Sequence, residues 1–138
     1  MSFVVDNSIA LAWCFEDEQT AGIMALLDRV TEAGAVAPQL WPVEALNGLL
    51  TAERRGRIDR GLRLRLAGFL RALPVRIDDE TASRTWITTA PLAELHRLTA
   101  YDATYLELAL RLGLPLATSD TALIAAAQTV GVPLLATA

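Results

Sequence analysis

The strongest constraint on the fold is the stretch of residues 98–120, which has the pattern of a helix, a short strand and the start of a second helix. Thr99 stands at the expected N-cap, apolar residues follow at helical spacing, and a glycine provides the stop. Residues 114–117 are apolar without polar alternation, which is typical of a strand buried in a parallel sheet. The stretch therefore predicts that Asp102 opens a buried helix and that Asp120 follows the end of a strand.

Short apolar runs alternate with helical patterns along the rest of the chain as well. The predicted strands are residues 3–5, 35–37, 75–77, 114–117 and 133–136. Helices are predicted after residues 6–8, over residues 20–33, from Pro42 to Gly56, from Asp59 to Pro74, from a cap at Asp78 or Asp79 to Trp86, between Thr99 and Gly113, and over residues 122–130. Pro91 interrupts residues 88–98, which leaves one kinked helix and two short helices both open. This order indicates a three-layer α/β fold, and the length suits one domain, residues 1–138.

The helix that begins at Pro42 carries a third acid, Glu44, in its first turn. Its predicted apolar stripe consists of Val43, Leu46, Leu49 and Leu50. The residues predicted on the side of Glu44 are Asn47, Gly48 and Thr51. Because these neighbours are small and weakly polar, they are expected to leave room for a ligand.

The chain contains twelve arginines and no lysine, and this absence excludes several functions. A P-loop needs a phosphate-binding lysine, and a Schiff-base enzyme needs a lysine amine. A phospho-aspartate domain usually holds its phosphoryl group with a lysine. All three functions are therefore improbable for this chain. The net charge of -4 argues against a protein that simply coats nucleic acid. No apolar run reaches the roughly 20 residues of a membrane span, and Cys14 is the only cysteine, so that a cytoplasmic protein is expected.

Four acids, Asp6, Glu44, Asp102 and Asp120, are the candidate site residues. Each one alone has a structural explanation at a helix N-terminus, where an acid contributes about 0.5 to 2 kcal/mol. Three of them follow short apolar runs, however, and should meet at one edge of the sheet, where their mutual repulsion requires a cation. All-oxygen ligation favours Mg²⁺ or Mn²⁺ over zinc. Such an ion suits phosphodiester hydrolysis, because it polarises a phosphoryl oxygen and acidifies a bound water.

The residues next to these acids in the sequence form short motifs. The segments are Asp6-Asn7-Ser8, Pro42-Val43-Glu44, residues 98–103 (LTAYDA), residues 105–109 (YLELA) and residues 116–120 (LATSD). Together they resemble a PIN domain of the VapC toxin type over essentially the whole chain. The resemblance implies a three-layer α/β/α fold with a central, mainly parallel sheet. It also implies a Mg²⁺-dependent endoribonuclease, the toxin of a type II toxin–antitoxin pair, usually dimeric and held inactive by a VapB-type antitoxin.

The resemblance also assigns roles to individual residues. It implies that Asp6, Glu44, Asp102 and Asp120 surround the metal and that Ser8 lies beside them. Many PIN domains carry a further acid or Asn a few positions after the last acid, whereas residues 121–124 (TALI) offer none, which weakens the case for a tightly held second ion.

Several polar residues around these acids have both a functional and a structural interpretation. Thr118 and Ser119 are expected to hydrogen-bond ligands or substrate, with turn and capping duty as the alternative. Arg54, Arg55 and Arg57 are the densest arginine group and the candidates for RNA phosphate contact, with a solvated helix surface as the alternative.

Two other functions compete with a nuclease. A non-catalytic binding module would use the acidic pocket to receive a basic segment of a partner protein. A phosphatase or phospho-acceptor domain fits less well, because its motif needs a second Asp where Ser8 stands and because the chain has no lysine.

Overall fold

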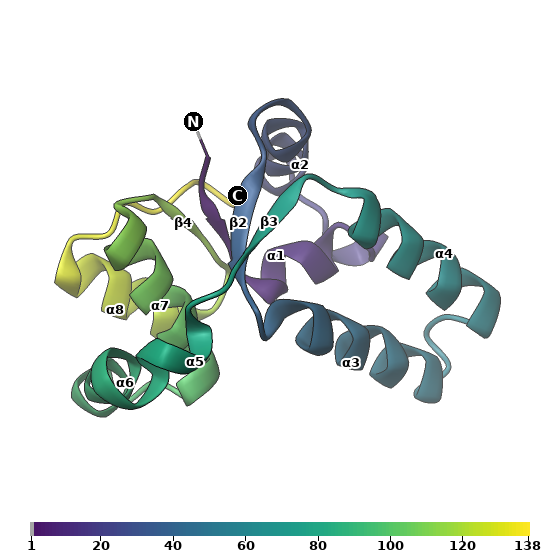
Figure 1. Ribbon diagram of the computed structural model, residues 1–138. Helices are drawn as coiled ribbons and strands as arrows, with labels where there is room; N and C mark the ends of the chain where they lie inside the picture. Colours follow the sequence, from purple (N-terminus) through teal and green to yellow (C-terminus); the bar gives the residue numbers. More distant parts are fainter. Residues whose placement is uncertain (1) are drawn as a thin grey trace.

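The computed structural model describes residues 2–138 and contains a parallel four-stranded sheet with the strand order β3-β2-β1-β4 (Figure 1). The strands are β1 (Val4–Val5), β2 (Ala35–Pro38), β3 (Val75–Asp78) and β4 (Leu116–Ala117). Val4 is paired with Val36 on one side and with Leu116 on the other. The predicted α/β fold with a parallel central sheet is confirmed.

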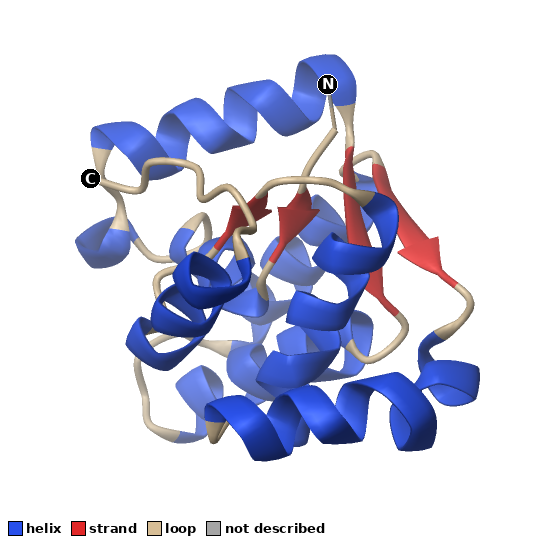
Figure 2. Ribbon diagram, turned by 90° about the vertical axis from the view of Figure 1, so that its left-hand side faces the viewer, coloured by secondary structure: helices blue, strands red, loops and turns tan. Residues whose placement is uncertain are grey.

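Helices make up most of the chain around this small sheet (Figure 2). They are α1 (Asn7–Ala12), α2 (Ala21–Ala33), α3 (Trp41–Arg54), α4 (Arg60–Ala72), α5 (Thr81–Arg84), α6 (Ala90–His96), α7 (Ala100–Leu112) and α8 (Thr121–Val130), with a 3₁₀ turn η1 (Glu16–Glu18) and a π turn η2 (Thr85–Thr89). Helices α1, α3 and α4 lie on one side of the sheet, and α5 to α8 lie on the other (Figure 1). Within the described residues, no helix has the length and apolar character needed to cross a membrane.

Side-chain caps begin four of the described helices, α2, α4, α7 and α8, whereas α1, α3, α5 and α6 begin without a side-chain cap bond. Thr20 Oγ1 accepts a hydrogen bond from the Ile23 backbone N–H at 3.0 Å, and Asp59 Oδ1 accepts one from Leu62 at 2.7 Å. Thr99 Oγ1 accepts one from the Asp102 backbone N–H at 3.1 Å, which confirms the predicted N-cap of α7. These bonds satisfy N–H groups that have no partner inside the helix.

The Thr99 cap should contribute measurably to stability. We expect Thr99→Ala to lower the free energy of unfolding by about 1 kcal/mol, because an N–H of the first turn loses its acceptor. Thr99→Ser keeps the oxygen and should retain most of that stability. Urea unfolding followed by circular dichroism measures both variants, and equal midpoints for the Ala and Ser variants would contradict the assignment.

The buried face of α3 differs from the predicted stripe. The buried residues are Trp41, Ala45, Leu49 and Ala52, whereas Val43 and Leu46 are exposed. The reason is the contact with α1, because a Cβ atom added to Gly48 would lie only 2.5 Å from a methyl carbon of Leu11. The α3 helix therefore turns its small residues toward α1. The space expected beside Gly48 for a ligand is filled by Leu11.

The chain between β3 and α7 also departs from the prediction. Asp78 and Asp79 do not cap a helix; Glu80 occupies the N-cap position of α5, and Asp78 forms an ion pair with Arg111. The helical path continues through the π turn η2 into α6, and Pro91, the second residue of α6, removes one backbone N–H from this path.

The predicted last strand is reduced to a single contact. Residues 133–136 form no regular strand, and only Leu134 makes a parallel bridge to Leu116 of β4. The bridge places Leu134 beside β4, which is otherwise an edge strand, and the chain then reaches α2, where the Gly22 N–H donates to the Ala138 carbonyl at 2.9 Å.

Candidate functional site

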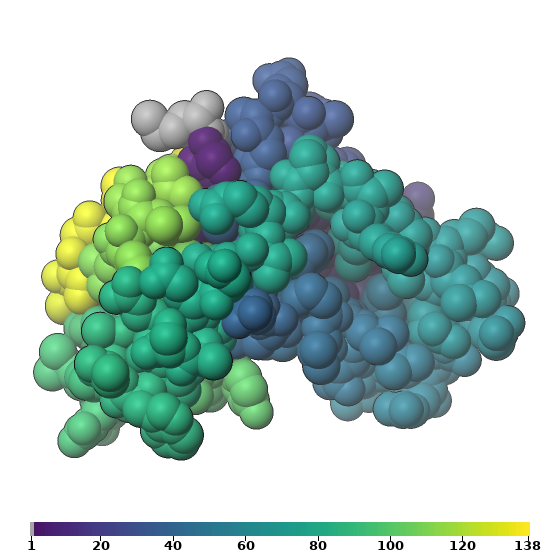
Figure 3. Space-filling model, in the orientation of Figure 1, coloured from purple at the N-terminus to yellow at the C-terminus, as the bar shows by residue number. Residues whose placement is uncertain are grey.

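Asp6 and Asp120 follow the carboxyl ends of two neighbouring parallel strands, β1 and β4. The helices that come next, α1 and α8, lie on opposite sides of the sheet (Figure 1). The connections from β1 to α1 and from β4 to α8 therefore leave the sheet in opposite directions. Open α/β sheets form a crevice for ligands at such a point. The space-filling view shows a notch in the lower edge of the molecule, between the part built from α3 and α4 and the part built from α5 and α6 (Figure 3).

Asp6 is held in place by two hydroxyl groups. Its side chain is 5% exposed, and its Oδ2 atom accepts hydrogen bonds from Ser8 Oγ and Thr118 Oγ1, each at 2.7 Å. The two hydroxyl oxygens accept in turn from the backbone N–H groups of Ser119 and Asp120, both at 3.1 Å. Burial raises the pKa of Asp6, and the two hydroxyl bonds oppose that increase. Ser8 and Thr118 thus lie beside the acid, and Ser119 contributes its backbone.

Glu44 reaches the same region from the first turn of α3. Its Oε1 atom accepts a hydrogen bond from the hydroxyl of Tyr105 on α7 at 2.6 Å. Burial raises the pKa of Glu44, and the negative charges of Asp6 and Asp102 raise it further, while the Tyr105 bond lowers it. The sequence pattern marked Tyr105 only as an apolar position of its helix, because nothing local to residue 105 reveals a partner 61 positions away.

Asp102 and Asp120 complete the group. Burial is the main cause that raises the pKa of Asp102 to about 6, and the charges of Asp120 and Asp6 add to it. Asp120 also serves as the N-cap of α8, since its Oδ1 atom accepts from the Leu123 backbone N–H at 2.8 Å. The structural interpretation of Asp120 therefore holds alongside its place in the site. The charges of Asp6 and Asp102 act on Glu44, and those of Asp120 and Asp6 act on Asp102, so the four carboxylates lie near enough to influence one another.

A hard divalent cation fits this set of donors. Every candidate ligand is a carboxylate oxygen, and within residues 2–138 no arginine forms an ion pair with any of the four acids. Burial and, to a smaller extent, the charges of neighbouring acids raise the pKa values of Glu44 and Asp102, and a bound cation would offset both costs. The oxygens do not form a tight group as they stand, since only Asp78, Asp79 and Glu80 in the described chain bring three ligand atoms within 4.8 Å.

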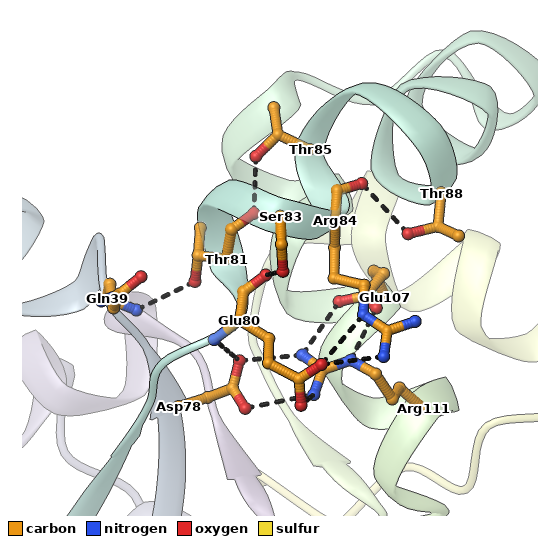
Figure 4. Close-up of polar contacts among 10 residues, drawn as sticks. All are labelled: Gln39, Asp78, Glu80, Thr81, Ser83, Arg84, Thr85, Thr88, Glu107 and Arg111. Carbon is orange, nitrogen blue, oxygen red and sulfur yellow. Dashed lines mark hydrogen bonds and ion pairs between the residues drawn. The ribbon is translucent and has the colours of Figure 1, made fainter.

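This second acidic group already contains a cation, the guanidinium of Arg111 (Figure 4). Arg111 Nη2 lies 2.8 Å from Asp78 Oδ2, Nη1 lies 3.1 Å from Glu80 Oε2, and Nε lies 2.8 Å from Glu107 Oε1. The hydrogen bond from Arg111 is the main cause that lowers the pKa of Asp78. We call Asp78, Glu80, Glu107 and Arg111 the Arg111 network. It links β3 to α7, and the guanidinium already occupies the position of a counter-charge for its carboxylates.

The three arginines proposed for RNA contact are not equivalent. Arg57 Nη2 lies 2.7 Å from Asp17 Oδ1 and 2.8 Å from Glu18 Oε2, so its charge is already shared with two carboxylates. Arg54 and Arg55 are exposed at the far end of α3. Because Arg54 comes ten residues after Glu44 in the same helical run, the helix rise separates their backbones by about 15 Å.

Comparison with known proteins identifies the family of this chain. Residues 3–129 match the PIN domain family. The structure is similar to the crystal structure of PAE2754 from Pyrobaculum aerophilum, with a TM-score of 0.68 and 26% sequence identity, over 91% of this chain and 84% of that chain. No curated protein matches the sequence at a significant level. PIN domains are generally nucleases that use divalent metal ions. Because the family match covers almost all of the chain, this protein belongs to the PIN domain family.

Proposed function

We propose that this protein is a Mg²⁺-dependent endoribonuclease and the toxin of a type II, VapBC-like toxin–antitoxin pair. The observation that carries the nuclease part is the convergence of Asp6, Glu44, Asp102 and Asp120 on one crevice without an arginine counter-charge in the described chain. Membership of the PIN domain family supports the same activity. The VapC-type resemblance of the segments around these acids supports the toxin role.

The residues around the proposed metal site would have different roles. The four acids would hold Mg²⁺ or Mn²⁺, and Ser8 and Thr118 keep Asp6 oriented through one of its two oxygens. When bound, the ion supplies the positive charge that polarises the scissile phosphodiester and makes the attacking water more acidic. Thr118 and Ser119 follow the carboxyl end of β4. The Thr118 hydroxyl accepts a hydrogen bond from the Asp120 N–H, and the Ser119 N–H donates one to Ser8, so both residues hold the loop that carries Asp120.

The proposal includes specific partners. RNA is the substrate, a VapB-type protein is the antitoxin, the active form is a homodimer, and the protein acts in the cytoplasm. The VapC-type resemblance supports all four statements. Exposed Arg54 and Arg55 would contact RNA phosphates at a distance from the acids, whereas Arg57 would first have to leave Asp17 and Glu18.

One experiment separates the nuclease from a non-catalytic binding module. Purified, partner-free protein is incubated with a panel of structured RNAs in Mg²⁺ and again with EDTA. We expect cleavage at discrete positions in Mg²⁺ and none in EDTA. Intact RNA under both conditions would refute the nuclease and favour a module whose acidic pocket receives a basic partner segment.

The metal-free site should also have a pH-dependent stability cost. The pKa of Asp102 is raised to about 6 from its ordinary value of 3.8, so its contribution to stability is complete below about pH 4 and is lost as the pH rises through 6. We expect Asp102→Asn, which cannot ionise, to lose less stability between pH 4 and pH 7.5 than the wild type does. Urea unfolding in EDTA at several pH values measures the difference, and Mn²⁺ should stabilise the wild type more than the variant. Parallel pH profiles for the two proteins would contradict this expectation.

A further inference from the structure

Tyr105 reaches the acidic site from the buried side of α7. Its side chain is fully buried, and its hydroxyl donates a hydrogen bond to Glu44 Oε1 at 2.6 Å. The bond connects α7 to α3, the two helices that bring Asp102 and Glu44 to the crevice. The hydrogen bond therefore connects the two helices that carry Glu44 and Asp102.

Three of the four acids share one arrangement of hydrogen bonds. Asp6 Oδ2 is held by two hydroxyl groups, Glu44 Oε1 by Tyr105, and Asp120 Oδ1 by a backbone N–H. In each case the second carboxylate oxygen makes no side-chain hydrogen bond within the described residues. Asp6 also accepts from the backbone of Asn7 and Ser8, whereas in Glu44 the bond to Oε1 fixes the side chain and Oε2 remains for a ligand.

Glu44 has the greatest need of such a restraint. A glutamate has three rotatable side-chain bonds, and Glu44 is only half buried, so packing alone does not hold its carboxylate. Tyr105 is rigid by comparison, because its ring is enclosed in the core and has two rotatable bonds. The hydrogen bond from the immobile Tyr105 hydroxyl therefore restricts the rotation of the Glu44 carboxylate.

We propose that Tyr105 is a positioning residue that orients Glu44 so that its free oxygen, Oε2, serves as a ligand of the divalent ion. This inference rests on the metal-dependent function proposed above. Groups that hydrogen-bond to metal ligands orient them and commonly control metal affinity by 10- to 100-fold. Filling the core does not require the hydroxyl, since phenylalanine occupies nearly the same volume, and the acceptor that this buried hydroxyl has is Glu44.

The test compares the same substitution at two positions of one helix. Tyr105→Phe removes the hydroxyl that bonds to Glu44 and to the Asn7 backbone, and Tyr101→Phe removes a hydroxyl from a residue that is 62% exposed. Isothermal titration calorimetry with Mn²⁺ alone, without RNA, measures affinity independently of cleavage. We expect Tyr105→Phe to weaken Mn²⁺ binding by about 10- to 100-fold and Tyr101→Phe to leave it unchanged.

A double-mutant cycle distinguishes positioning from a general structural role. If Tyr105 acts through Glu44, Tyr105→Phe should cause no further loss of Mn²⁺ affinity in a Glu44→Ala background. Glu44→Asp provides a second route to the same question, because the shorter side chain keeps its charge but moves away from the hydroxyl. We expect Glu44→Asp to lose affinity to a similar degree, and the result does not depend on how well Tyr105→Phe folds.

The outcomes separate the two proposals. Wild-type protein that binds no Mn²⁺ would overturn the metal-dependent function and this inference with it. Wild-type protein that binds Mn²⁺ no more tightly than Tyr105→Phe does would overturn the role of Tyr105 alone. An undiminished effect of Tyr105→Phe in the Glu44→Ala background would likewise assign the effect to the fold rather than to Glu44.

Discussion

Asp6→Asn is expected to abolish RNA cleavage and the growth arrest caused by expression, with a loss in cleavage rate of more than about 100-fold. The substitution keeps the size of the side chain and removes its charge at the centre of the acidic group. The fold should remain intact, because the buried charge costs stability in the metal-free protein, as the raised pKa of Asp6 indicates. Cleavage of a labelled RNA in Mg²⁺ and the far-UV circular dichroism spectrum measure the two properties separately.

Asp79→Asn is the matched control for this result. Asp79 belongs to the acidic group beside Arg111, and its side chain is exposed. If the metal ion is bound by the four-acid site, Asp79→Asn should retain cleavage while Asp6→Asn loses it. Full activity in Asp6→Asn, or loss of activity only in Asp79→Asn, would refute the assignment of the metal site.

Arg111→Met is expected to lower the free energy of unfolding by about 3 to 5 kcal/mol, the typical cost of removing one partner from a buried ion pair. The Arg111 side chain is 12% exposed and contacts Asp78 and Glu107, which are themselves buried. Without the guanidinium these two carboxylates would face each other with no counter-charge. Urea unfolding at neutral pH measures the loss.

The pH dependence of this loss follows from the lowered pKa of Asp78. A carboxyl group with a lowered pKa stabilises the fold above its ordinary pKa and loses that contribution as the pH falls through the lowered value. The difference between wild type and Arg111→Met should therefore be largest near pH 7 and shrink below about pH 4, where the carboxylates take up protons. Arg84→Met is the control, because Arg84 forms a half-exposed pair with Glu80 and should cost less than about 1 kcal/mol. Equal losses in the two variants would contradict a buried network.

What could be predicted from the sequence was largely what short segments determine. The Thr99 cap and the strand before Asp120 depend on residues within a few positions of each other, and both are found where they were expected. That the four acids form one metal site stays a prediction, and its basis in the sequence is that strands in a parallel sheet place their carboxyl ends at a common edge.

What could not be predicted depends on pairs of residues far apart in the chain. The contact between Gly48 and Leu11 decides which face of α3 is buried, and the pairing of Arg111 with Asp78 replaces the expected helix cap. The spacing of Glu107 and Arg111, four residues apart on α7, was a visible signal for an ion pair, but the third partner comes from β3. Tyr105 was missed for the same reason, since Glu44 lies on another helix.

The bond between Thr118 and Asp6 has a consequence for the order of events during protein synthesis. The two residues are separated by 112 positions, so Asp6 leaves the ribosome long before the group that fixes it has been translated. A nascent chain that lacks α7 and β4 also lacks Asp102 and Asp120. The proposed metal site is therefore complete only after nearly the whole domain has emerged and folded.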